Sequence, residues 1–339
     1  MSRRALVADG AGSLTLEDRV ALEPRPGEVV LRPAWCGLCG TDLELLRGEV
    51  DPAFVRYPLT LGHEWSGLVE AVGEGVAGIA PGMRCVAEGI IPCGHCARCR
   101  AGETNVCETY DEVGFTREGA AGDQVSVPAR VVHRLDDDVP LRDAALVEPS
   151  AVVMTGLEKV GTLRARPGLR VLIVGDGTIA LLATQLIGLW SPAEVLVAGR
   201  RPEQEDLARA LGATGFTTGD PHGGFDLAIE AAGSPAAALT AIGALRRGGT
   251  ALLFGLPPAG STLVLPADRI VNDDLSIVAS FGYTAAGWAS VVSLLNSGRF
   301  RPGALVTHTF ALDEYERAFA ELAEPRGARG KVLLELAGG

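Results

Sequence analysis

The sequence predicts an α/β protein of two domains, one rich in β-strands and one built on a doubly wound parallel sheet. The chain has 339 residues, which is longer than one hydrophobic core usually supports. Short apolar runs separated by glycine and proline occupy residues 1–150, a pattern typical of β-strands. From Leu169 onward apolar strands alternate with helical segments, which indicates a parallel sheet covered on both faces.

The expected elements follow from local composition. In the β-rich half, strands are expected at residues 29–31, 65–69 and 124–127. In the second half, buried strands are expected at residues 170–174, 194–198, 225–229, 250–254 and 275–279. Helices are expected near residues 202–211, 235–246 and 285–297, the first with proline in its opening turn and Gly212 at its end.

The composition excludes some classes of partner. The formal charge is −12, and hydrophobic residues make up 47% of the chain, so an acidic protein without a basic stripe is a poor candidate for binding nucleic acid or anionic membrane. The apolar run at residues 170–190 contains Asp176 between two glycines, so strand, turn and helix explain it better than a membrane span. No apolar segment follows the basic start, so we expect no signal peptide and a cytoplasmic location.

Four of the seven cysteines lie close together in one loop. The spacing is C-x2-C-x2-C-x7-C, formed by Cys93, Cys96, Cys99 and Cys107. Four thiolates around one point suit a tetrahedral zinc ion and leave no position open for a substrate, so this site is predicted to be structural. Disulfides would suit a small secreted protein instead, and the ferredoxin iron–sulfur pattern continues with x3-C-P rather than x7.

The strand at residues 170–174 ends in a dinucleotide fingerprint. Residues 175–180 read Gly-Asp-Gly-Thr-Ile-Ala, the G-x-G-x-x-A form, in which Gly175 makes the tight turn and Gly177 lets the backbone approach the pyrophosphate. Thr178 and Ile179 open the following helix, whose free N–H groups favour phosphate. A glycine turn without a ligand is the alternative, but the strand–turn–helix context favours a nucleotide.

The end of the next strand predicts which nucleotide binds. An NAD site normally has an acid there to bind the ribose 2′-hydroxyl, but this position holds Gly199. Arg200 and Arg201 follow, and guanidinium groups suit a 2′-phosphate. We therefore expect NADP(H) in preference to NAD(H); the alternative is a pair of solvated surface arginines.

Three further motifs could form an open metal site. Cys39 lies in the run Cys-Gly-Leu-Cys-Gly-Thr-Asp, His63 precedes Glu64, and Glu148 precedes a proline. One thiolate, one imidazole and one carboxylate would leave a fourth zinc position for water or substrate. Each residue alone is more often explained by packing.

Taken in order, these motifs resemble those of the zinc-dependent medium-chain alcohol and polyol dehydrogenase family over essentially the whole chain. The glutamate–proline pair at residues 148–149 resembles the branch with polyol, glucose and threonine dehydrogenases. The resemblance implies a GroES-like catalytic domain at residues 1–151 and 290–339, with the zinc lobe at 92–108. A Rossmann domain would occupy residues 152–289.

The resemblance also implies residue roles. Cys39 and His63 would bind the catalytic zinc, with Glu148 as third ligand, directly or through water. Glu64 would lie beside the metal and enter its coordination during turnover. Asp42 would orient His63 through the second ring nitrogen, and Thr41 would bond the substrate oxygen.

Glu44 and Cys36 lie close to Cys39 in the sequence. The family often has a histidine at the outer end of a proton relay, five residues after the zinc cysteine, where this chain has Glu44. Glu44 would carry protons, bond a polar substrate or simply be exposed. Cys36 gives an apparent C-x2-C with Cys39, but the resemblance assigns the ligand to Cys39, and we interpret Cys36 as a packed thiol.

The expected activity is hydride transfer between NADP(H) and a secondary alcohol, polyol, cyclitol, sugar or amino alcohol, interconverting alcohol and ketone. Two zinc ions per chain are expected, one catalytic and one structural. A strand at residues 275–281 would extend a sheet across a subunit boundary, as in this family, giving a homodimer or homotetramer. The alternatives are a zinc-independent quinone or enoyl reductase and a non-catalytic NADPH-binding protein.

Overall fold

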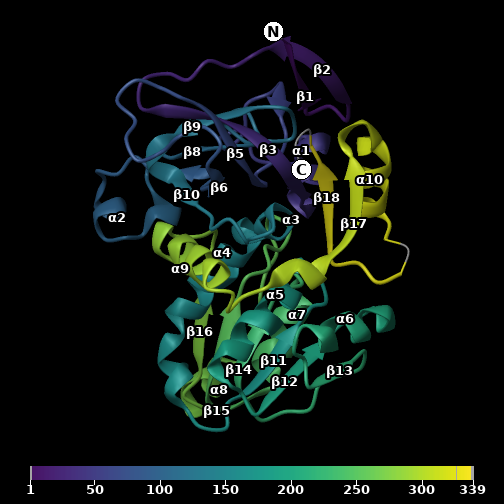
Figure 1. Cartoon of the computed structure of the whole chain (residues 1–339). Coiled ribbons are helices and arrows are strands. Elements are labelled where there is room, and N and C mark those ends of the chain that lie inside the picture. The colour runs from purple at the N-terminus through teal and green to yellow at the C-terminus, as the bar shows by residue number, and fades with distance from the viewer. Residues whose placement is uncertain (1, 326, 337–339) are drawn as a thin grey trace. The chain divides into compact units, whose positions relative to one another are not determined.

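A computed structural model describes residues 2–325 and 327–336 (Figure 1). The chain divides into two compact units. Of these residues, unit 1 comprises 2–148, 284–325 and 331–336, and unit 2 comprises 149–283 and 327–330. The C-terminal part of the chain therefore returns to the unit formed by the N-terminal part.

Unit 1 is built around a seven-stranded sheet with the order β10-β6-β5-β3-β18-β17 and with β9 paired to β3. Its strands are β3 (Glu28–Leu38), β5 (Glu64–Val72), β6 (Arg84–Ala87), β9 (Val125–Pro128), β10 (Val132–Arg134), β17 (Val306–Ala311) and β18 (Lys331–Glu335). Smaller sheets pair β1 (Ser2–Ala8) with β2 (Leu14–Val20) and β4 (Leu59–Thr60), and β7 (Ile90–Ile91) with β8 (Asp111–Glu112). The helices are α1 (Gly40–Arg47), α2 (Ala97–Arg100), α3 (Leu141–Ala144), α9 (Ala285–Asn296) and α10 (Tyr315–Ala323).

Strand pairing in unit 1 brings distant parts of the sequence to one end of β3. Leu38 of β3 lies opposite Val332 of β18, and Gly37 lies opposite Glu64 of β5. The residue after Leu38 is Cys39. The sheet register therefore places the first residues of β5 and β18 beside the end of β3, where α1 begins.

Unit 2 contains a six-stranded parallel sheet with the order β13-β12-β11-β14-β15-β16. The strands are β11 (Arg170–Val174), β12 (Glu194–Ala198), β13 (Gly215–Thr217), β14 (Phe225–Glu230), β15 (Leu245–Leu253) and β16 (Ser276–Ala279). The helices are α4 (Val147–Lys159), which begins in unit 1, α5 (Thr178–Ile187), α6 (Glu205–Ala210), α7 (Pro235–Gly243) and α8 (Ala267–Asn272). The strand order reverses between β11 and β14, and doubly wound sheets bind nucleotides at such a point.

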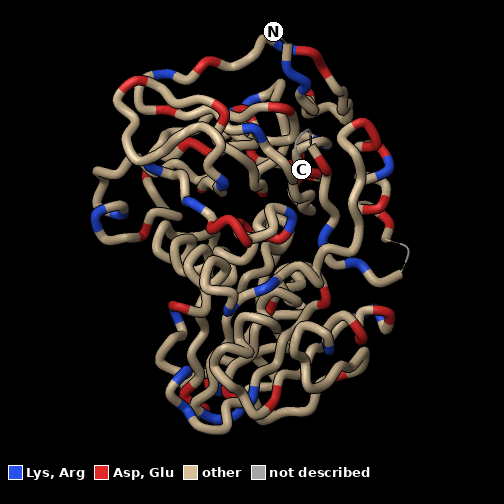
Figure 2. Tube along the Cα trace, viewed as in Figure 1, with Lys and Arg blue, Asp and Glu red and all other residues tan. Residues whose placement is uncertain are grey.

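The predicted α/β class is confirmed, and the expected strands of the second half are all present. Two helix boundaries differ from the expectation. Residues Pro202–Gln204 form a 3-10 turn before α6, and α7 ends at Gly243 because Leu245 already pairs with Phe225 of β14. Within the described residues, no helix combines the length and apolar character that crossing a bilayer requires. Figure 2 shows basic and acidic residues interspersed along the trace.

Candidate metal centre and cofactor site

The turn between β3 and α1 fixes the position of Cys39. Cys39 is the N-cap of α1, and the side chain of Asp42, three residues on, accepts a hydrogen bond from the Cys39 N–H at 2.7 Å. This hydrogen bond satisfies the N–H group of Cys39, which the helix itself leaves unpaired. The thiol is therefore held at a rigid helix start.

His63 lies directly before β5 and is only 7% exposed. Its Nδ1 lies 3.6 Å from Oδ1 of Asp42, and its ring packs 5.3 Å from the ring of Phe115. Burial disfavours the charged imidazole, but the Asp42 carboxylate outweighs it and holds the pKa of His63 well above its ordinary value. Asp42 therefore contacts both sides of the site, through the backbone of Cys39 and the ring of His63.

Three side chains converge in unit 1 as a candidate metal centre. The ligand atoms of Cys39, His63 and Glu64 all lie within 4.8 Å of one another. Zinc is bound in proteins by thiolate, imidazole and carboxylate groups, and three protein ligands leave one position open. The donor set therefore fits a catalytic zinc ion.

Glu148 lies in the first turn of α4, outside this group of three. Burial raises the pKa of its carboxyl group to about 8, and the charge of Glu64 adds to the effect. The two carboxylates are thus close enough to oppose each other's ionisation. A divalent cation held by Cys39, His63 and Glu64 would favour the charged form of both carboxylates.

Two residues of this region were not predicted from the sequence. Lys331 is 2% exposed at the start of β18, and its ammonium group forms an ion pair with the Glu64 carboxylate, which is 1% exposed. Glu112 lies at the end of β8, and burial raises the pKa of its carboxyl group to about 7. Neither residue belongs to a recognisable motif, and only the strand pairing shows that Lys331 reaches Glu64.

The remaining residues expected at this site occupy different environments. The Thr41 hydroxyl oxygen lies 3.7 Å from the Cys39 sulfur. Glu44 is exposed on α1, and its carboxylate makes no hydrogen bond or ion pair to another described residue. Cys36 is fully buried in the core of unit 1, and desolvation raises the pKa of its thiol.

The four clustered cysteines form a second candidate metal centre. Their sulfur atoms all lie within 4.8 Å of one another, with 3.9 Å between the sulfurs of Cys93 and Cys99. Backbone N–H groups of Cys96 and Cys99 point at the sulfurs of Cys93 and Cys96, each at 3.4 Å. The N–H groups of His95 and Cys96 lower the pKa of the Cys93 thiol to about 6. Such N–H donors stabilise thiolates, the form that binds metal.

In unit 2 the fingerprint loop joins β11 to α5. Gly175 has φ +128°, and a side chain there would meet the backbone of Ala231 at 3.0 Å, so the turn requires glycine. Gly177 is the N-cap of α5, and Thr178 and Ile179 form its first turn. The Thr178 hydroxyl is engaged with the Gly330 carbonyl at 3.3 Å, so backbone N–H groups are the donors that this turn offers to a phosphate.

A carboxylate lies next to Gly199 at the end of β12. A Cβ atom on Gly199 would come within 2.8 Å of the Asp176 side chain. Asp176 also forms an ion pair with Arg201, with Nη2 and Oδ1 2.8 Å apart. Arg200 is exposed, and its guanidinium group makes no ion pair within the described part of the chain. The two arginines are therefore not equivalent.

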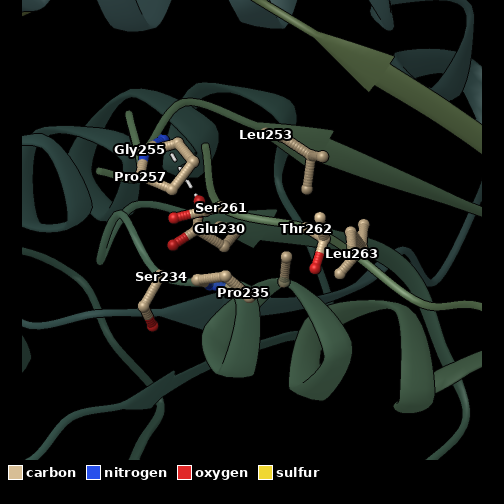
Figure 3. A pocket seen from close by; sticks show the side chains of 10 residues that line it. Glu230, Ser234, Pro235, Leu253, Gly255, Pro257, Ser261, Thr262 and Leu263 are labelled. Carbon is tan, nitrogen blue, oxygen red and sulfur yellow. Dashed lines mark hydrogen bonds between the residues drawn. The ribbon is translucent and has the colours of Figure 1, made fainter. Parts of the chain in front are cut away.

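A small cavity of about 110 Å³ lies at the carboxyl ends of β14 and β15 (Figure 3). Glu230 on its wall is already satisfied, accepting hydrogen bonds from the N–H groups of Ala232 at 2.8 Å, Gly233 at 2.7 Å and Gly255 at 3.1 Å. Its carboxylate therefore organises the loops at this sheet edge.

Matches to known protein families identify the family of this chain. Residues 25–137 match the alcohol dehydrogenase GroES-like domain, and residues 142–325 match the glucose dehydrogenase C-terminus. The chain belongs to the zinc-dependent medium-chain alcohol and polyol dehydrogenase family. The expected GroES-like class of the β-rich half is thereby confirmed.

Individual members of the family align with this dehydrogenase over nearly its whole length. It is 30% identical to L-threonine 3-dehydrogenase of Aeromonas hydrophila over 94% of this chain and 95% of that one. A proposed zinc-binding dehydrogenase from Sinorhizobium meliloti 1021, solved with NADP, has a TM-score of 0.91 and 28% identity, covering 99% of both chains.

A second similar solved structure contains NADH instead of NADP. It is described as a short chain alcohol dehydrogenase from Escherichia coli CFT073 complexed with NADH, with a TM-score of 0.90 and 26% identity, covering 99% of this chain and 100% of that one. This dehydrogenase is therefore an oxidoreductase that uses a nicotinamide dinucleotide and acts on a small-molecule alcohol.

Proposed function

We propose that this dehydrogenase depends on zinc and transfers hydride between NADP(H) and a secondary alcohol, such as a polyol, sugar, cyclitol or amino alcohol, interconverting alcohol and ketone. The observation that supports this most strongly is the convergence of the Cys39, His63 and Glu64 ligand atoms within 4.8 Å. The resemblance to a threonine dehydrogenase and to the C-terminal part of glucose dehydrogenases supports a polar substrate.

The residues of unit 1 have distinct tasks in this proposal. Cys39 and His63 hold the zinc ion, with Glu148 or Glu64 as the third ligand. When bound, zinc would lower the pKa of a coordinated oxygen and polarise a carbonyl. Asp42 would fix the orientation of His63, and the Thr41 hydroxyl, beside the Cys39 sulfur, would exchange a proton with the substrate oxygen. Exposed Glu44 would receive that proton.

The four cysteines at 93–107 would hold a second zinc ion with a purely structural role. Their sulfurs form a closed set of four, and such a set leaves no position for a substrate. The lowered pKa of Cys93 supports a thiolate there at neutral pH. One chain would therefore bind two zinc ions.

In unit 2, Gly175, Gly177, Thr178 and Ile179 would bind the pyrophosphate, and residues 199–201 would distinguish the two nicotinamide cofactors. Gly199 supplies no carboxylate of its own, and the exposed Arg200 is available to a 2′-phosphate. Arginine binds such a group through two parallel N–H donors. These features support NADP(H) as the preferred cofactor.

A substrate screen tests the activity. The zinc-loaded protein is assayed against a panel of ketones and polyols with both cofactors, and the decisive result is alcohol–ketone turnover that is faster with NADP(H). Reduction of quinones or enoyl compounds without zinc would favour the zinc-independent alternative. Nicotinamide binding without turnover of any compound would favour a non-catalytic role.

The chain would also assemble with copies of itself. Among the described strands, β16 is the last in the order of its sheet, and the edge of such a strand readily pairs with another strand. Large apolar side chains are exposed on or near it, with Ile277 37% and Phe281 55% exposed. A homodimer, or a homotetramer built from it, would cover them.

A further inference from the structure

The fingerprint loop and the end of β12 are joined by one side chain, Asp176. Its Oδ2 accepts hydrogen bonds from the backbone N–H groups of Arg200 at 2.8 Å and Arg201 at 3.0 Å. Its Oδ1 accepts two more from the Arg201 guanidinium, at 3.2 Å from Nε and 2.8 Å from Nη2. Both carboxylate oxygens are therefore engaged, each by two donors.

These contacts define the charge at the position where this class of sheet binds the adenosine ribose. The side chain that an NAD site places at the strand end is missing, because the residue is Gly199. The carboxylate of Asp176 fills the adjoining space, since a Cβ atom on Gly199 would lie 2.8 Å from its Oδ2. A carboxylate group is thus present at this position, supplied by the glycine-rich loop instead of the strand.

Asp176 also restrains one of the two arginines. Nη2 of Arg201 reaches the backbone carbonyl of Asp176 at 3.0 Å as well as the carboxylate, and this side chain is 27% exposed. Hydrogen bonds from Arg201 and from the two N–H groups outweigh burial and lower the pKa of Asp176. The pair is therefore charged and mutually neutralised, which leaves Arg200 as the uncompensated cation.

We infer that Asp176 is a specificity-determining residue that weakens the discrimination of this dehydrogenase in favour of NADP(H). Its carboxylate neutralises Arg201, so that Arg200 is left to attract a 2′-phosphate bound beside Gly199, whereas the 2′-hydroxyl of NAD(H) needs no cation. The inference rests on the proposed nucleotide site. It goes beyond the proposal that Arg200 favours NADP(H), because it gives Asp176 the opposite effect on the cofactor preference.

Direct titration of both reduced cofactors tests this without a known substrate. Dissociation constants for NADPH and NADH are measured by fluorescence with the zinc-loaded protein and with Asp176→Asn, which keeps an oxygen acceptor but removes the charge. We expect the ratio of the NADH constant to the NADPH constant to rise on the order of tenfold, because Arg201 then carries an unpaired positive charge near the phosphate. Asp176→Ser, which keeps a smaller acceptor, should change the ratio in the same direction.

The control is Asp206→Asn, which removes an exposed acid of α6 and should leave the ratio within about twofold, since solvent screens such a charge. If both Asp176 variants weaken NADPH and NADH equally, the residue is only a structural brace and the inference fails. A ratio that falls also overturns it. Should the unmodified protein prefer NADH, the proposed cofactor preference fails, but a rise in the ratio on Asp176→Asn would still support the role of Asp176.

Discussion

Lys331 and Glu64 form an ion pair inside the candidate catalytic site, with side chains only 2% and 1% exposed. Burial disfavours a charged ammonium group, but Glu64, with further contributions from Cys39 and Glu148, outweighs this and raises the pKa of Lys331. The lysine is therefore charged and balances the charge of the Glu64 carboxylate. It would also compete with a zinc ion for the Glu64 carboxylate.

Replacing Lys331 with methionine should strongly destabilise the zinc-free protein. Removing one partner of a buried ion pair leaves the other charge uncompensated, at a cost of about 3 to 5 kcal/mol. Urea unfolding of chelator-treated protein measures the effect, and adding Glu64→Gln to the same chain should restore most of the loss. Lys159→Met, at an exposed lysine of α4, is the control. Equal stability of the Lys331 and Lys159 variants would contradict the assignment.

Asp42→Asn should weaken zinc binding at the catalytic site while leaving the four-cysteine site intact. The Asp42 carboxylate lies 3.6 Å from Nδ1 of His63. Loss of such a partner lowers metal affinity by about 10- to 100-fold. Competition with a chromogenic chelator measures this. Asp51→Asn, at an exposed residue before β4, is the matched control, and an unchanged affinity for Asp42→Asn would show that His63 needs no such support.

Glu112→Gln should change the pH dependence of stability. Burial raises the pKa of Glu112 from 4.5 to about 7, so between these values the folded protein keeps a proton that the unfolded chain has lost. Stability therefore falls as pH rises through this window. The unfolding free energy of the variant minus that of the unmodified protein should increase from pH 4.5 to pH 7 in zinc-free protein. A flat difference would mean that Glu112 titrates normally.

Cys96→Ser should remove zinc from the lobe and expose it to proteolysis. The thiolates of residues 93–107 are held together by a few N–H donors and short turns, and small lobes of this kind depend on metal for folding. Limited trypsin digestion should cut the variant at Arg98 or Arg100, while the unmodified protein stays intact until a chelator is added. Resistance of the variant to trypsin would argue against a structural zinc ion there.

Ile277→Lys should dissociate the proposed dimer. A charge on the exposed edge strand β16 opposes strand pairing with a second copy. Light scattering after size-exclusion chromatography gives the mass directly, and Val20→Lys, at an 84% exposed residue of unit 1, is the control. A monomeric unmodified protein would contradict the proposed dimer. A variant that remains dimeric would show that the interface does not lie at β16.

The sequence predicted the parallel sheet because its signals are local. Residues 170–174 and 194–198 are short apolar runs with a glycine turn or a charged turn directly after them, and β11 and β12 have the same bounds. The four-cysteine loop is equally local, since all its ligands lie within 15 residues of sequence. Such features need no knowledge of long-range pairing.

The residues that were missed depend on contacts between distant parts of the chain. Lys331 meets Glu64 across 267 positions only because β18 pairs with β3, and a lysine before an apolar strand has no distinctive pattern. Asp176 occupies a variable position of the G-x-G-x-x-A fingerprint. Its side chain reaches the end of β12, and no spacing rule describes that contact.

The zinc content of purified chains tests the central claim most directly. Mass spectrometry of metals should find two zinc ions per unmodified chain, and one in Cys39→Ala, with hydride transfer nearly abolished and the fold retained. Cys85→Ala, at a buried cysteine outside both groups, should keep both ions. The account would be contradicted if Cys39→Ala retained both zinc ions, or if it transferred hydride as fast as the unmodified protein.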